Sequence, residues 1–173
     1  MKKKLLVLLA LVATTLVSAQ VDQIFKHNGD VVKGKVLRVE EYTIAFVYEG
    51  EDAEYTIGRY SVEKILHDSG REEDISDKIV VKSKKDWEKV VILEDKSYIA
   101  GLKKGKEVRG KTGLINFQTG NTGDRKAEKK LKMSAAEQGC AFILLTADKT
   151  TTGASSNRLG GSQAIKKGIG YMY

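Results

Sequence analysis

The amino-acid sequence predicts an α+β protein, with a small N-terminal antiparallel β-sheet or barrel followed by a small α+β domain with one main helix packed on a sheet. Apolar and polar residues alternate over residues 22–77, whereas residues 125–138 have the pattern of an amphipathic helix. Residues 22–77 contain 7 Lys and Arg against 14 Asp and Glu, and residues 78–173 contain 20 against 9. This charge asymmetry predicts two units with different surfaces.

The N-terminal residues have the three parts of a secretory signal peptide. Lys2–Lys4 form a basic segment, Leu5–Leu16 form an apolar run, and Val17–Ala19 supplies the small residues at which signal peptidase cleaves. The apolar run is shorter than the about 20 residues that span a bilayer. We therefore expect cleavage before Gln20 and export to the periplasm, the cell surface or the medium of a bacterium.

The composition predicts how the rest of the chain is divided. After the signal peptide at residues 1–19, we expect an acidic all-β module over residues 20–77, a charged connector over residues 78–89 and a basic α+β domain over residues 90–173. Cys140 is the single cysteine, so the chain has no intramolecular disulfide. We interpret Cys140 as a small buried hydrophobic residue, because this half has no histidine that could activate a nucleophile.

Short strands separated by turns are predicted in the acidic half. Asn28-Gly29 is typical of a type I′ hairpin turn, in which both central residues need positive φ. Apolar residues in period two then indicate about five strands in a strongly curved sheet or barrel. The positions that carry this pattern are Val31, Val32, Val36, Leu37, Val39, Ile44, Phe46, Tyr48, Tyr55, Ile57, Val62, Ile65 and Leu66.

The basic half is predicted to contain a strand at Val90–Leu93, a helix, a strand from Cys140, a mobile loop over Lys149–Gln163 and a terminal strand. Asp124 or Asn121 is the expected N-cap of the helix, and Gly139 its C-terminal stop. One helix face carries small and apolar residues that favour packing on a sheet: Ala127, Leu131, Ser134, Ala135 and Gln138. The opposite face carries four cations that are a candidate anion-binding surface: Arg125, Lys126, Lys129 and Lys132.

The segment GKEVRGKT matches the P-loop pattern G-x-x-x-x-G-K-[ST]. A P-loop needs a buried strand before it and, after it, a helix whose N–H groups bind the phosphates. The preceding AGLKK is polar and short, and the following GLINFQTGNTG is too rich in glycine for a helix, so a strand or bent hairpin is favoured. We interpret the match as chance and expect no nucleotide cofactor. Its motif positions are Gly105, Gly110, Lys111 and Thr112.

Two histidines, His27 and His67, are the weak candidates for a metal site. Each lies beside a turn and has an aspartate nearby in the sequence, Asp30 and Asp68 respectively. A transition metal usually needs three or four ligands at fixed geometry, and the chain has no spacing motif for such a set. We therefore expect exposed turn histidines and no bound metal.

Spaced turn glycines and core residues mark the acidic half: Asp22, Ile24, Gly29, Gly34, Val36, Val62 and Ile65. With this pattern, the half resembles a small β module of secreted Bacteroidetes proteins, which implies a scaffold and no particular site. Packing positions mark the basic half: Leu131, Ala135, Ala136, Gly139, Ile143, Gly170 and Tyr171. That half is similar to small α+β envelope domains of the Rcs-type stress-sensor lipoprotein and of YbjQ-like families. It lacks their lipid-bearing and additional cysteines, and also a ligand cluster for metal binding.

The leading functional hypothesis is an exported, non-enzymatic envelope protein that acts as an interaction or structural module, because no catalytic constellation is present. An alternative is a binding protein for anionic envelope ligands, such as lipopolysaccharide phosphates, that uses the basic half. A third is a hydrolase with a site built from Asp, Glu and Ser. The expected partner is an envelope protein or an anionic polymer, with peripheral membrane contact and no nucleic acid. The opposed charges also predict that the halves dock or that chains associate head to tail.

Overall fold

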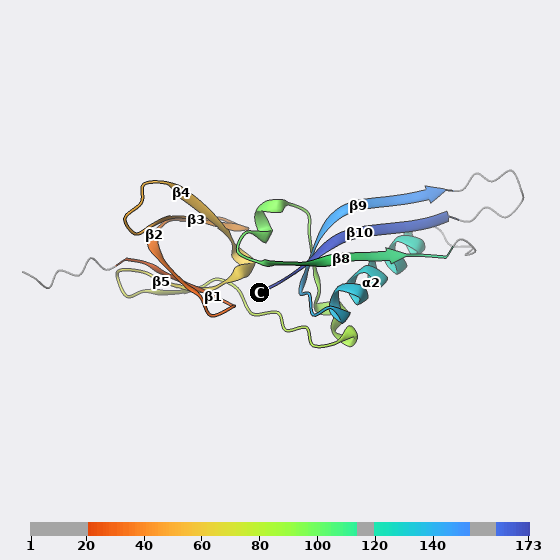
Figure 1. Ribbon diagram of the computed structural model, residues 1–173, viewed down its shortest axis with the longest axis horizontal. Helices are drawn as coiled ribbons and strands as arrows, with labels where there is room; N and C mark the ends of the chain where they lie inside the picture. Colours follow the sequence, from red (N-terminus) through yellow and green to blue (C-terminus); the bar gives the residue numbers. More distant parts are fainter. Residues whose placement is uncertain (1–20, 114–119, 153–161) are drawn as a thin grey trace, which may run out of the picture.

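The computed structural model describes residues 21–113, 120–152 and 162–173 of the chain (Figure 1). These residues form ten strands and one main α-helix, in agreement with the predicted α+β class. Two sheets follow one another along the long axis of the molecule, one toward each end, and the C-terminus lies between them (Figure 1). No helix among the described residues is long and apolar enough to cross a membrane. The predicted signal peptide lies outside the described residues.

The N-terminal sheet has six antiparallel strands in the order β4-β3-β2-β1-β5-β6. Its strands are β1 (Gln23–Lys26), β2 (Val31–Val39), β3 (Thr43–Tyr48), β4 (Glu54–Gly58), β5 (Val62–Leu66) and β6 (Glu72–Asp74). The outer strands β4 and β6 are not paired with each other in the described part of the chain, so the structure shows an open sheet and no closed barrel. The prediction of short antiparallel strands is confirmed, with one strand more than expected.

The hairpin between β1 and β2 differs from the predicted type I′ turn. Gly29 has φ +94°, but no non-glycine residue in the described chain has positive φ, so Asn28 does not. The N–H of Gly29 donates to the carbonyl of Lys26, and the N–H of Lys26 donates to the carbonyl of Asp30. This is a three-residue loop, in which one glycine in the left-handed region closes an ordinary turn.

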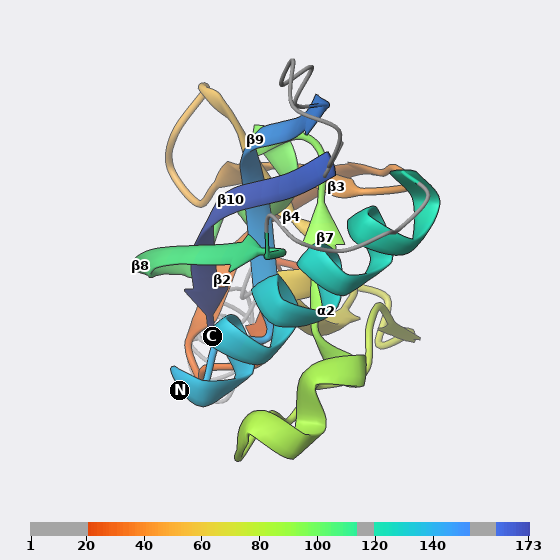
Figure 2. The same cartoon turned by 90° about the vertical axis from the view of Figure 1, so that its right-hand side faces the viewer.

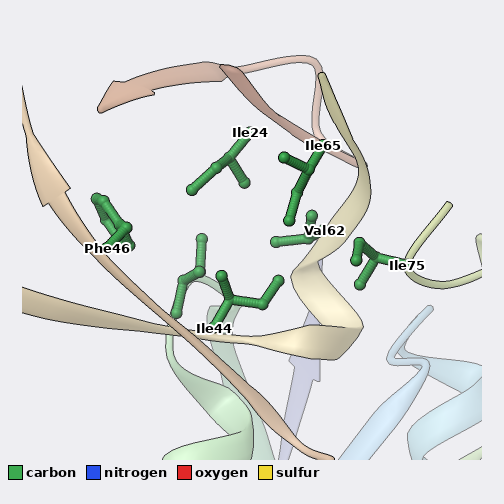
Figure 3. Packing of buried hydrophobic residues seen from close by; sticks show 7 residues of the cluster. Ile24, Ile44, Phe46, Val62, Ile65 and Ile75 are labelled. Carbon is green, nitrogen blue, oxygen red and sulfur yellow. The ribbon is translucent and has the colours of Figure 1, made fainter. Parts of the chain in front are cut away.

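Apolar side chains from the strands of the N-terminal sheet point toward one another and form a core (Figure 3). The buried members are Ile24, Ile44, Phe46, Ile57, Val62, Ile65 and Ile75. All but Ile24 and Ile75 are positions of the predicted strand pattern. Burial of a large apolar side chain stabilises the folded state by about 1.5–3 kcal/mol, so this cluster is the main source of stability for the sheet.

The C-terminal sheet has four strands in the order β7-β9-β10-β8. They are β7 (Val91–Leu93), β8 (Lys103–Lys111), β9 (Phe142–Thr152) and β10 (Ser162–Met172). β7 pairs with β9 in parallel, whereas the other pairs are antiparallel. Lys149–Thr152 belong to β9 and Ser162–Gln163 to β10, so these ends of the predicted mobile loop are paired strand.

The helix α2 (Gly120–Glu137) covers one face of the C-terminal sheet (Figure 2). Three of the predicted face residues, Ala127, Leu131 and Ala135, are fully buried, whereas Gln138 is exposed beyond the helix end. Gly139 has φ +72° and ends the helix as predicted.

The start of α2 corrects the predicted cap. The helix begins at Gly120, so Asn121 and Asp124 both lie inside it. The carboxylate of Asp124 forms an ion pair with Lys166 of β10 at 3.1 Å. This tertiary contact favours helical backbone in a segment of low intrinsic propensity.

In the described connections lie three 3₁₀ helices: η2 (Arg59–Ser61), η3 (Lys84–Lys89) and η4 (Lys96–Ile99). Ser83 and Asp86 form a capping box at the start of η3, within the predicted charged connector. η4 lies next to the region where the two sheets meet, which we call the joint. There the N–H of Gly58 donates to the carbonyl of Ala100 at 2.8 Å.

Aromatic rings complete this joint. Tyr42 lies 4.4 Å from Tyr98, and Tyr60 lies 5.3 Å from Phe142, measured between ring centroids. Among the described residues, no ion pair joins 22–77 to 78–173. The halves meet through aromatic and backbone contacts and through the ammonium of Lys78, which donates to the carbonyl of His27 at 2.6 Å. Attraction between the opposed net charges and head-to-tail association of chains stay predictions.

Candidate anion-binding surface

The four predicted cations of α2 have different surroundings. Arg125, Lys126 and Lys129 are exposed, whereas Lys132 is partly buried and lies 3.6 Å from Glu128 on the same helix. The ammonium of Lys129 lies 4.7 Å from the ring centroid of Trp87 in η3. This cation–π contact holds Lys129 over the edge of the helix and leaves part of its charge exposed.

A shallow groove of about 210 Å³ lies where α2 faces the end of β8. The described residues of its lining include three lysines and no carboxylate: Thr112, Gly113, Lys126, Lys129, Lys130 and Met133. The ammonium of Lys130 donates to the carbonyl of Lys111 at 2.9 Å, which fixes one wall of the groove. Lysine charges that converge on a concave surface create a positive potential that attracts anions.

The sequence predicted the groove only in part. Lys126 and Lys129 belong to the candidate surface, but Arg125 and Lys132 do not line this groove. Lys130 could have been found from its spacing, because it lies one helical turn after Lys126. Thr112 and Gly113 are brought to the helix by the pairing of β8 with β10, which no local pattern encodes.

The P-loop motif lies along β8. Gly105, Gly110 and Lys111 are strand residues, and β8 pairs with β10, so alternate backbone N–H groups are committed to the ladder. The hydroxyl oxygen of Thr112 accepts the N–H of Ala164 at 2.9 Å, within a buried contact. A strand with these partners differs from the glycine turn and helix N-terminus that bind phosphates in a P-loop.

Both motif glycines are explained by packing. A Cβ at Gly110 would lie 1.9 Å from the carbonyl oxygen of Ala127, so the glycine lets α2 approach the sheet closely. A Cβ at Gly105 would lie 3.0 Å from the sulfur of Cys140. Cys140 is fully buried and burial raises the pKa of its thiol, so its thiolate is disfavoured.

The structure places the two candidate histidines in separate clusters. His67 is 3.0 Å from the carboxylate of Glu73 and 3.7 Å from that of Asp22, and the contact with His67 lowers the pKa of Glu73. Both oxygens of Asp22 already accept backbone N–H groups, from Val36 and from Asp68. In the described chain, no three His, Cys, Asp or Glu residues are arranged to hold a metal ion.

His27 is buried at the joint between the sheets, which corrects the expectation of an exposed turn histidine. Its Nε2 lies 3.0 Å from the hydroxyl of Ser76, and its ring lies 4.8 Å from that of Tyr173. The Ser76 hydroxyl donates to the carbonyl of Val62 at 2.7 Å. The same hydroxyl also lies 3.3 Å from the carbonyl of Arg59, so Ser76 links His27 to the backbone of η2 and of β5.

Acidification is expected to weaken the fold through His27. Burial lowers the pKa of His27 below its ordinary value of 6.5, against the opposing effect of Glu63. The unfolded chain then binds a proton more readily than the folded chain, so stability is full above pH of about 6.5 and falls as pH drops through the depressed pKa. Melting temperatures between pH 8 and pH 5 should show a shallower fall for His27→Gln than for wild type. Equal slopes would contradict this role.

Comparisons with known proteins give no family for this chain: no family model, no curated protein and no solved structure matches it.

Proposed function

We propose that this chain is a non-enzymatic module of the bacterial envelope that binds an anionic partner through the groove between α2 and β8. The observation that carries the proposal is a concave lining whose described residues include three lysines and no carboxylate. Its predicted signal peptide supports an envelope location, and phosphate groups of envelope polymers have the chemistry that such a lining favours.

The groove is small enough to hold one anionic group rather than a whole polymer. Lys126 and Lys129 supply exposed ammonium groups at its rim, with Lys129 held over the ring of Trp87, and Lys130 is restrained by the carbonyl of Lys111. The methionine of the lining, Met133, offers a soft apolar wall that suits the hydrocarbon part of a ligand. A phosphate carried on a sugar or lipid therefore fits the groove better than a free ion.

Replacing Lys126 and Lys129 together with glutamine should weaken binding to lipopolysaccharide by about 10- to 30-fold at low salt, because each lysine near an anionic surface contributes about 1 kcal/mol. The measurement is a titration of residues 20–173 with purified lipopolysaccharide. A matched control is Lys103→Gln with Lys104→Gln, which removes the same charge from the exposed start of β8. Equal losses in the two variants, or no binding by wild type, would refute the groove as the site.

A further inference from the structure

The C-terminal sheet has a second cationic surface on the face that α2 leaves open. Val108, Gly110 and Lys166 face the helix, so the intervening residues of β8 and β10 face the other way. Near the joint this open face is covered by the cluster around Phe142 and Tyr171. Farther along the strands, it carries four cations from three adjacent strands: Arg109, Lys111, Lys149 and Lys167.

The strand register places like charges against one another. Arg109 is the direct cross-strand partner of Lys167, and Lys111 and Lys149 flank Ile165 from opposite sides. Like charges directly opposite each other destabilise a sheet. None of the four forms an ion pair with a described carboxylate, although Glu107 lies on the same side of β8, two residues from Arg109.

Lys166, the neighbour of Lys167, is a structural cation whose charge is neutralised by aspartates within the fold. Lys166 is buried on the helix face, with its ammonium 2.5 Å from Asp148 and 3.1 Å from Asp124. The two aspartates nearest this end of the sheet therefore neutralise the buried lysine. On the other face three of the four cations are exposed and Lys167 is partly buried, and none has such a partner among the described residues. Their mutual repulsion would be relieved by an external anion.

We propose that this open face binds an extended acidic polysaccharide. Neighbouring strands are about 4.8 Å apart and alternate residues of one strand about 6.8 Å apart, so the cations form a flat grid that fits repeated charges along a polymer. Ile165 and Ala147 lie among the cations and provide an apolar floor for sugar rings. Single-stranded nucleic acids are bound with aromatic side chains that stack on bases, and the described residues of this part of the face include none. The surface lies opposite the groove and goes beyond the function proposed above.

The test compares two variants with the same loss of charge on opposite faces of the sheet. The probe is polygalacturonate, a linear polymer with one carboxylate per sugar, and neutral dextran is the ligand control. Arg109→Gln with Lys167→Gln should lower the affinity of residues 20–173 for polygalacturonate by at least tenfold at low salt. Lys126→Gln with Lys129→Gln should lower it by a smaller factor, because those lysines line the groove on the opposite face.

Thermal melting of the free protein gives an independent readout. Removing Arg109 and Lys167 should raise Tm at low salt, because their repulsion is lost, and this gain should shrink near 1 M salt, where the Debye length is about 3 Å. A lower Tm would mean that the cations are structural, and equal affinity losses in both variants would mean unspecific attraction. Tighter binding of polyuridylate than of polygalacturonate would assign the face to nucleic acid. Each result overturns the proposal, whereas failure of lipopolysaccharide binding at the groove leaves it intact.

Discussion

Replacing Gly110 with alanine is expected to lower the free energy of unfolding by about 3 kcal/mol, near the upper end of the usual cost of overpacking. The added Cβ would lie 1.9 Å from the carbonyl oxygen of Ala127 and 2.7 Å from the backbone nitrogen of Leu131. Both atoms belong to the backbone of α2, so no side chain can rotate away to relieve the overlap. The helix must move from the sheet, which opens the core around Leu131 and Cys140.

A matched control lies on the helix itself. Gly123 is buried in α2, but a Cβ there would have Ala164 as its nearest neighbour at 3.9 Å, an ordinary contact. Gly123→Ala should therefore stabilise the protein by about 0.5–1 kcal/mol through helix propensity. Urea unfolding followed by the fluorescence of Trp87 measures both changes. If Gly110→Ala were as stable as wild type, close packing of α2 on β8 would not be the reason for this glycine.

This pair of glycines shows what local sequence can and cannot predict. The glycine-rich sequence around the P-loop match argued against a helix and favoured a strand or bent hairpin. β8 is a strand, but residues 120–123 at the end of that segment begin α2, so this part of the prediction is wrong. The sequence did not predict that Gly110 would lie beneath a helix, because the contact depends on the register between β8 and β10. The same limit applies to Asp124, which sequence rules placed at a helix cap and which forms an ion pair with a buried lysine from another element.

The candidate site was predictable to a similar extent. Helical spacing separated the buried Ala127 and Leu131 from the exposed Lys126 and Lys129, because the period of the helix alone determines which residues share a face. The groove also needs Thr112, which only the fold brings to the helix. Net charge predicted attraction between the halves but not the aromatic joint, because counting charges does not show which surfaces face each other.

The second large effect is expected from Asp22, the first residue of the sequence pattern that marks the acidic half. Its carboxylate accepts the N–H of Val36 at 2.8 Å and that of Asp68 at 2.9 Å, and its own carbonyl accepts the N–H of Gly34. One side chain thus joins the start of β1 to the middle of β2 and to the turn after β5. Gly34, which donates to Asp22, also packs closely against β3, because a Cβ there would lie 2.2 Å from the carbonyl oxygen of Val47.

Asp22→Ala should lower the free energy of unfolding by about 3 kcal/mol, since two charge-assisted hydrogen bonds are lost and the partly buried N–H of Val36 has no replacement acceptor. Asp22→Asn keeps one acceptor oxygen and should lose about half as much. Urea unfolding followed by far-UV circular dichroism reports on the whole β-structure. Asp30→Ala, in the exposed hairpin loop, is the control for loss of an aspartate and should change stability little. A similarly small effect of Asp22→Ala would mean that water replaces the carboxylate, and that the residue does not hold β1, β2 and the later turn together.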